Sequence, residues 1–328
     1  MARQMMLAAL YRTTGSAAEV LEIVKIARPD PGPGEVRVRV AVSAVNPTDV
    51  KNRSGIVTWP IDVFQVPHHD GAGTIDAIGP GVDQTRLGER VWLTMAAHTN
   101  RWGTAAQWCV VPAFKARRLP DESDFLLGAT LGVPAVTAAH CLIADGSVHG
   151  RDVLVHGGAG AVGRCGIELG RWSGARVVAT VSSEAKAEVA RACGAELVVD
   201  YRREDVASVI RGFSAGIHRV LEVSLAANAS IDAEVCGLNA VVVVFGTEGG
   251  EATLPVRPPL FKSLSFRFIL LYNFSREELE RAADEVERAL DDGALTLAPI
   301  TRFSLDDITS AHELQEDGPF GRVLLEIP

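Results

Sequence analysis

Residues 152–163 read DVLVHGGAGAVG, a short apolar strand pattern that ends in a run of glycines. A strand that turns at glycines into a helix directs several backbone N–H groups, and the positive end of the helix dipole, at one place. A pyrophosphate can bind there without a basic side chain, because glycines permit a tight turn and close approach of the backbone. The G-x-G-x-x-G spacing alone is weak evidence, so this interpretation depends on the sequence around it.

The residues that follow have the order of a βαβ unit. The pattern predicts a helix over Arg164–Ser173, a strand over Ala175–Val181, a helix over Glu184–Cys193 capped by Gly194, and a strand over Glu196–Val199. Strands and helices that alternate in this way are typical of an α/β fold with a doubly wound parallel sheet. We therefore expect a dinucleotide site at the glycine run.

The end of the second strand indicates which dinucleotide is bound. NAD sites carry an Asp or Glu there for the ribose 2′-OH, whereas this strand ends in Ser182 and Ser183. Lys186 lies one turn into the next helix, and Tyr201 begins a Tyr-Arg-Arg sequence after the third strand. These groups can bind a 2′-phosphate, which favours NADP; the alternative is an ordinary solvated charged face.

The composition is that of a globular enzyme. The 328 residues are 47% hydrophobic and 22% charged, and the net charge of −9 argues against binding to nucleic acid or an anionic membrane. No apolar run approaches the roughly 18 residues of a membrane span. Five scattered cysteines without a C-x-x-C pair fit reduced thiols in the cytoplasm.

The chain divides into three parts. Residues 1–125 read as short strands separated by Pro/Gly turns, residues 126–270 as the dinucleotide domain, and residues 271–328 as a tail that returns to the first part. In the first part we expect strands at Leu7–Leu10, Glu35–Ala44, Gly73–Ile78 and Glu89–Leu93. In the tail we expect a helix over Ser275–Asp292 with a Ser275/Glu278 capping box, then Thr301–Ser304, a helix over Leu305–Leu314 and a strand over Gly321–Ile327.

Several stretches along the chain resemble the medium-chain dehydrogenases/reductases, and among them the zinc-free, zeta-crystallin-like quinone oxidoreductases. They are AVNPTDVKNRSG (44–55), HDGAGTIDAIGPGV (69–82), GVPAVTAAHCL (132–142), the glycine run, EVSLAANAS (222–230) and VVVFGTEGG (242–250). The resemblance implies a Rossmann domain beside a GroES-like β-barrel domain. It also implies a homodimer, which we expect to form through an edge strand near Leu254–Phe268.

The zinc enzymes of this family use a Cys, a His and a second Cys, with a Glu beside the His. In this chain His69 and Asp70 match the His-Glu pair, but Asn46 stands at the first cysteine position and Val133 near the second. One imidazole and one carboxylate are too few ligands for a catalytic zinc. We therefore expect no metal.

The resemblance implies contacts to NADPH at many positions. Asn46 and Thr137 are expected to flank the nicotinamide, and Asn46 is also a candidate catalytic residue. The remaining expected cofactor contacts are Ala159, Gly160, Ala161 and Val162 at the pyrophosphate, Ser182, Lys186 and Tyr201 at the adenosine phosphate, Phe245, Gly246, Thr247, Ile269, Leu270 and Leu271 around the nicotinamide, and Asn228 and Arg322.

One position departs from the family pattern. Zeta-crystallin-like enzymes often have a tyrosine five residues after the asparagine, where this chain has Lys51. Lys51 is a candidate catalytic residue, able to protonate an enolate or hold an oxyanion, or else it forms a structural ion pair with Asp49.

Without a metal, hydride transfer from NADPH suits an acceptor that is already electrophilic. The expected function is zinc-independent reduction of a quinone or another activated carbonyl or alkene. The alternatives are an enoyl or enone reductase of a biosynthetic pathway, and a non-catalytic NADPH-binding or RNA-binding protein.

Overall fold

The computed structural model describes residues 4–57, 59–246 and 250–328, and its chain separates into two compact units. Unit 1 comprises residues 1–133 and 297–328, and unit 2 comprises residues 134–296. These boundaries differ from the expected 125/126 and 270/271. Helix α3 (Phe125–Ala129) packs on the strands of unit 1, which keeps it there. Residues up to 296 lie in unit 2, where α10 packs on α5, Trp172 donates a hydrogen bond to Asp292 (2.9 Å) and Arg164 donates one to Thr296 (3.1 Å).

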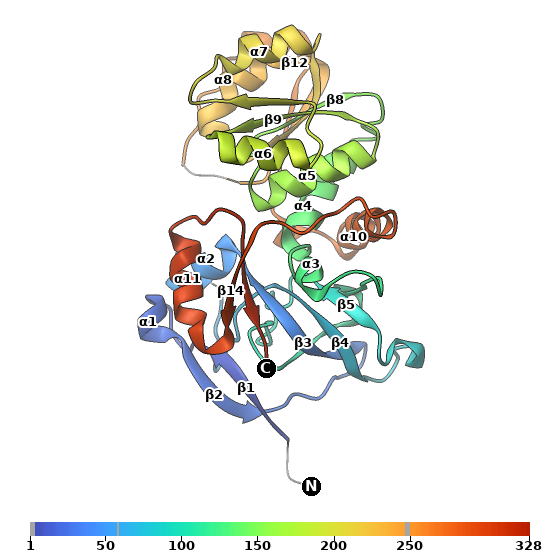
Figure 1. Ribbon diagram of the computed structural model, residues 1–328, viewed down its shortest axis with the longest axis vertical. Helices are drawn as coiled ribbons and strands as arrows, with labels where there is room; N and C mark the ends of the chain where they lie inside the picture. The colour runs from blue at the N-terminus through green and yellow to red at the C-terminus, as the bar shows by residue number, and fades with distance from the viewer. Residues whose placement is uncertain (1–3, 58, 247–249) are drawn as a thin grey trace. The chain divides into compact units, whose positions relative to one another are not determined.

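Unit 2 is built on a six-stranded, entirely parallel sheet in the order β10-β9-β8-β11-β12-β13. Figure 1 shows α5 and α6 on one face of this sheet and α7 and α8 on the other. This strand order is that of a Rossmann fold. Its first and fourth strands, β8 and β11, are neighbours, and successive strands are added outward in opposite directions from that pair. The expected doubly wound sheet is confirmed.

The strands of unit 2 are β8 (Asp152–Val155), β9 (Arg176–Val181), β10 (Leu197–Asp200), β11 (Ile217–Glu222), β12 (Cys236–Val244) and β13 (Ser265–Phe268). The helices are α4 (Gly132–Ile143), which begins at the unit boundary, α5 (Ala161–Trp172), α6 (Glu184–Ala192), α7 (Val206–Phe213), α8 (Leu225–Val235), α9 (Arg257–Lys262) and α10 (Arg276–Asp291). The expected helix over Ser275–Asp292 is α10, and its Ser275/Glu278 capping box is present. Gly194 follows α6 with φ +100°, as expected of a helix cap.

Unit 1 is organised around a seven-stranded sheet in the order β14-β15-β3-β4-β5-β7, with β6 also paired to β3. Alternate valines of the long strand β3 fill the barrel core with Ile75, Val91 and Leu93. The C-terminal strands β14 and β15 join this sheet, so the last residues of the chain, from Leu297 on, lie in unit 1.

The strands of unit 1 are β1 (Met5–Leu10), β2 (Glu22–Ala27), β3 (Glu35–Val45), β4 (Asp70–Ile78), β5 (Arg90–Leu93), β6 (Trp108–Pro112), β7 (Ala116–Arg118), β14 (Ile300–Ser304) and β15 (Arg322–Glu326). Its helices are α1 (Ala17–Val20), α2 (Pro47–Ser54), α3 and α11 (Ile308–Glu316). Short 3₁₀ turns lie at Gln84–Arg86, Ala113–Lys115 and Leu305–Asp307 in unit 1 and at Leu271–Asn273 in unit 2.

Candidate active site and cofactor-binding loop

The glycine run connects β8 to α5 by a turn too tight for larger side chains. Gly157 has φ +67°, and a Cβ on Gly163 would lie 2.2 Å from the Gly157 carbonyl oxygen. The N-cap of α5 is Gly160, so Ala161 and Val162 form the first turn of the helix. First-turn amides have no partner within their own helix and, with the helix dipole, suit a phosphate. The residues from Ala159 to Val162 therefore fit a pyrophosphate.

The expected adenosine-phosphate residues meet at the ends of β9 and β10. The Lys186 ammonium donates a hydrogen bond to the Ser182 hydroxyl (3.0 Å), and the Tyr201 amide donates to the Val181 carbonyl (3.0 Å). Glu184 accepts a hydrogen bond from Arg191 (2.6 Å), so that carboxylate is engaged within α6. A hydroxyl and an ammonium at this edge suit a 2′-phosphate.

The other expected cofactor residues of unit 2 lie in several environments. Phe245 and Gly246 follow β12, where the Phe245 amide donates to the Glu222 carbonyl (3.0 Å). Asn228 donates its side-chain amide to the Glu222 carboxylate (3.0 Å). Thr137 and Leu271 are buried, Ile269 is half-buried, Leu270 is exposed, and Thr247 lies outside the described residues.

In unit 1, Asn46 is held between a carboxylate and a guanidinium. Its amide nitrogen donates to Asp70 (2.8 Å), and its carbonyl oxygen accepts from Arg322 (2.9 Å). The Arg322 guanidinium also lies 3.7 Å from Asp70, and all three residues are buried. Burial raises the pKa of Asp70 to about 6 although Arg322 and Asn46 act in the opposite direction. The network fixes which way the Asn46 amide points.

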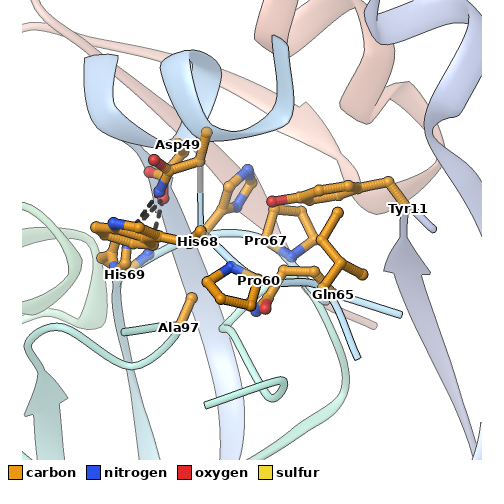
Figure 2. Close-up of a pocket in the computed structure, with 11 residues that line it drawn as sticks. Tyr11, Asp49, Pro60, Gln65, Pro67, His68, His69 and Ala97 are labelled. Atoms are coloured by element: carbon orange, nitrogen blue, oxygen red, sulfur yellow. Dashed lines mark hydrogen bonds and ion pairs between the residues drawn. The ribbon is translucent and has the colours of Figure 1, made fainter. Parts of the chain in front are cut away.

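A second carboxylate, Asp49, organises the start of α2. It accepts hydrogen bonds from the backbone amides of Asn46 (2.7 Å) and His69 (3.1 Å). Figure 2 shows Asp49 pointing from α2 toward His69. Burial raises the pKa of Asp49 well above its usual value, despite the backbone hydrogen bond from Asn46. Burial lowers the pKa of the His69 imidazole well below its usual value, because a buried ring disfavours the positive charge, so the ring stays neutral.

Asp49 and His69 line a cavity of about 20 Å³, roughly the space that one water molecule needs. Tyr11, which follows β1, lines it as well (Figure 2). Asn52 and Trp59 are also among its lining residues. Tyr11 and Asn52 are not among the residues expected from the sequence, because nothing in their local pattern distinguishes them from other polar residues.

Lys51 lies apart from this network. Its side chain is exposed on α2, whereas Asp49 two residues earlier is buried and bonded to backbone amides. Among the described residues no ion pair joins the two, so the expected structural pair is wrong. A helix places residues two apart on different faces, which accounts for the separation.

A pair of buried histidines also lies in unit 1. His68 and His312 face each other with their Nε2 atoms 2.9 Å apart, and the His68 Nδ1 atom lies 2.8 Å from the Ser43 hydroxyl. One Nε2 must accept, so the pair needs at least one neutral ring. Burial lowers the pKa of His312 to about 3, with a further lowering by Arg53.

Because His312 is buried and neutral in this pair, we expect the free energy of unfolding to fall in acid. The unfolded chain binds a proton at His312 near pH 6.5, but the folded chain does not until about pH 3, so stability is complete above pH 6.5. Below that value His312 should cost about 1.4 kcal/mol of unfolding free energy per pH unit. Urea unfolding of wild type and His312→Gln at pH 7.5 and 5.5 checks this. We expect a smaller loss in the variant, and equal losses would contradict it.

Comparison with known proteins matches the two parts of the chain to two family models. Residues 32–121 match the alcohol dehydrogenase GroES-like domain, and residues 161–288 match the zinc-binding dehydrogenase domain. Human quinone oxidoreductase is 27% identical over 313 residues, which are 94% of each chain. The chain belongs to the quinone-oxidoreductase-like medium-chain dehydrogenases/reductases.

Two further proteins are similar to this medium-chain dehydrogenase/reductase. A mycobacterial protein solved in complex with NADPH has a TM-score of 0.82 and 29% identity, covering 98% of this chain and 99% of its own. A 2-haloacrylate reductase from Burkholderia is 33% identical over 217 residues, which are 64% of this chain and 63% of its own. Membership of this family makes the protein an oxidoreductase.

The zinc position of this medium-chain dehydrogenase/reductase does not fit the metal. Asn46 uses its amide on Asp70 and Arg322, and Val133 contributes a backbone amide to Asp70 (2.8 Å) rather than a ligand side chain. The Arg322 guanidinium adds a positive charge 3.7 Å from Asp70. In the part of the chain that the structure describes, no third His, Cys, Asp or Glu ligand gathers around His69.

Within the described ranges, no helix combines the length and the apolar character that a membrane crossing requires.

Proposed function

We propose that this protein is an NADPH-dependent, zinc-independent reductase of quinones or other activated carbonyl or alkene acceptors. The observation that carries the proposal is the replacement of a zinc site by the buried Asn46–Asp70–Arg322 network. Bound NADPH would supply the hydride. The residues at that position do not suit a Lewis-acid metal, so we expect an acceptor that is already electrophilic.

The residues of the chain would bind and orient rather than react covalently. The amides of Ala161 and Val162 suit the pyrophosphate, and Ser182 and Lys186 suit the 2′-phosphate. Asn46 still has a second amide hydrogen after it donates to Asp70, and this hydrogen is available to the nicotinamide or to an acceptor oxygen. Arg322 and Asp70 hold that amide in one orientation, which removes the cost of ordering it.

The test is a spectrophotometric assay of NADPH oxidation. The acceptors are 1,4-benzoquinone, 9,10-phenanthrenequinone, an enone and an enoyl thioester, each also tried with NADH. Rapid NADPH oxidation by the quinones is expected. Oxidation by the enone or thioester alone would favour the second candidate, an alkene reductase, to which the similarity to a 2-haloacrylate reductase points. Tight NADPH binding with no turnover would contradict both.

Lys186 should set the preference for NADPH over NADH. Lys186→Glu removes a cation beside Ser182 and introduces a charge that repels a phosphate. Charged hydrogen bonds contribute about 1.5–3 kcal/mol, so NADPH affinity should fall about 10- to 100-fold while NADH affinity changes little. Fluorescence titration with both cofactors measures this, and Lys25→Glu on exposed β2 is the matched control. An equal loss for both cofactors would contradict the assignment.

We also propose that two copies associate through the edge strand β13. Val256, Leu260, Phe261 and Phe268 lie on or next to this edge and are each 70–73% exposed. An unpaired strand edge beside exposed apolar side chains suits a second copy in a two-fold arrangement. Sedimentation should give twice the chain mass for wild type and for the control Leu87→Glu, but the monomer for Phe268→Glu. A concentration-independent monomer in wild type would contradict it.

The proposed compartment is the cytoplasm. All five cysteines are buried free thiols, which suits a reducing environment. The expected acceptor is a small molecule, and the net charge of −9 gives no support to an RNA partner.

A further inference from the structure

Three buried ionisable side chains converge within unit 2, and none of them is a residue assigned above to a phosphate. His156 follows β8, Glu222 ends β11, and Asp232 lies on α8. Their exposed fractions are 3%, 0% and 0%. Charged side chains are almost never buried this completely unless they are paired or bind a metal.

The donor atoms of the three side chains are spaced like the ligands of one metal ion. His156 Nε2 lies 3.0 Å from Asp232 Oδ1 and 3.6 Å from Glu222 Oε2. One ligand atom from each residue lies within 4.8 Å of the other two. Metal–ligand bonds of about 2.0–2.2 Å put adjacent ligands roughly 2.8–3.6 Å apart, from octahedral to tetrahedral geometry. The two measured separations, 3.0 and 3.6 Å, fall within that interval.

Two of these groups, His156 and Glu222, form hydrogen bonds to neighbouring residues through atoms other than those that face the cluster. His156 Nδ1 lies 3.0 Å from the Thr180 hydroxyl, which leaves Nε2 for the cluster. Glu222 Oε1 accepts from the Ser224 amide and from the Asn228 side chain. Outer hydrogen bonds of this kind orient metal ligands in known sites. The trio thus has both ligand atoms and supporting contacts.

One oxygen of each carboxylate lacks a hydrogen-bond donor. Glu222 Oε2 and Asp232 Oδ2 have no hydrogen-bond partner among the described residues, although both are buried. A single Nε2–H group cannot donate well to two carboxylates at once. Buried carboxylate oxygens without hydrogen-bond partners destabilise the folded state. A divalent cation bound by both carboxylates would offset that loss.

We propose that His156, Glu222 and Asp232 bind one divalent transition-metal ion. One imidazole and two carboxylates form the ligand class that takes Zn²⁺, Mn²⁺ or Fe²⁺. The ion would tie β8, β11 and α8 together directly beside the glycine run, since His156 immediately precedes Gly157. This site is separate from the zinc position of the family at Asn46 and His69, and it does not depend on the proposed acceptor.

The first test uses the wild-type protein, stripped with a chelator and then dialysed against Zn²⁺ or Mn²⁺ alone. Elemental analysis should give one ion per chain, and the thermal unfolding midpoint should rise with the metal concentration. Co²⁺ should give a visible absorption spectrum of a protein-bound ion. A wild-type protein that takes up no stoichiometric metal overturns the proposal without any variant being needed.

Variants then locate the ion. Asp232→Asn and Glu222→Gln keep the side-chain shape and should abolish stoichiometric binding. Thr180→Val leaves all three ligands in place and should weaken binding about 10- to 100-fold, the range for a lost outer hydrogen bond. His149→Gln removes an exposed imidazole of the same unit and should bind like wild type.

A shared proton is the competing explanation for the buried oxygens. In that case wild type would bind no ion. Glu222→Gln would fold, would be at least as stable as wild type, and would unfold at the same temperature with or without metal. That result would overturn the metal assignment. Unaltered binding in Asp232→Asn, Glu222→Gln and Thr180→Val would overturn it equally, by placing the ion elsewhere.

Discussion

Gly163→Ala is expected to abolish useful NADPH binding. The added Cβ would lie 2.2 Å from the Gly157 carbonyl oxygen and 3.0 Å from the Gly158 Cα atom, so the turn between β8 and α5 must open. Because that turn presents the first amides of α5, we expect the dissociation constant for NADPH to rise by about 100-fold or more, equivalent to about 2.7 kcal/mol. Fluorescence titration of NADPH measures the effect.

The matched control is Gly212→Ala on α7 of the same unit. A Cβ there meets no atom within 4 Å, and replacing a helical glycine by alanine should stabilise the protein by about 0.4–1 kcal/mol. NADPH affinity should stay at the wild-type value. Unchanged NADPH affinity in Gly163→Ala, with Gly212→Ala behaving as described, would show that the glycine turn does not bind the cofactor.

Arg322→Met is expected to cost about 3–5 kcal/mol of unfolding free energy. The substitution removes the guanidinium that donates to Asn46 and lies 3.7 Å from Asp70, and it leaves a carboxylate buried without its cation. Asn46 also loses the partner of its carbonyl oxygen, so only its hydrogen bond to Asp70 still orients the amide. Urea unfolding measures the stability, and kcat measured with the best acceptor should fall as well.

Asp70→Asn supplies the second half of a double-mutant cycle. In Asp70→Asn/Arg322→Met both buried charges are absent, so the double variant should lose about 1–3 kcal/mol less than the sum of the two single losses. A strictly additive double variant would show that Asp70 and Arg322 do not stabilise each other. Recovery of stability without recovery of kcat would separate the orientation of Asn46 from simple folding.

Local sequence patterns were sufficient to predict much of unit 2. The glycine run, the alternation of strands and helices, and the Ser275/Glu278 capping box each depend on residues a few positions apart. Such patterns can be interpreted without the fold, because strand and helix periodicity and helix caps are short-range effects. The proximity of Ser182 and Lys186 is of the same kind, since they lie four positions apart where β9 leads into α6.

The domain boundaries were less well predicted from the same patterns. Helix α10 was assigned to the returning tail, but contacts such as that between Trp172 and Asp292 keep it in unit 2. Its amphipathic pattern showed that one face is buried and not which part of the chain covers it. Lys51 is exposed whereas Asp49 is buried, and the sequence of this short polar helix does not indicate which of the two faces solvent.

By itself the sequence determined the doubly wound parallel sheet and the glycine turn, and its resemblance to the family indicated the loss of the cysteine ligands for zinc. Only the tertiary structure decided that Arg322 completes the Asn46–Asp70 network across 276 positions, that His312 faces His68 across 244, and that His156 meets Glu222 and Asp232. The physical reason is that backbone geometry depends on neighbours in the chain. The partner of a buried charge, and with it the pKa and the orientation of the side chain, depends on which distant segments pack together.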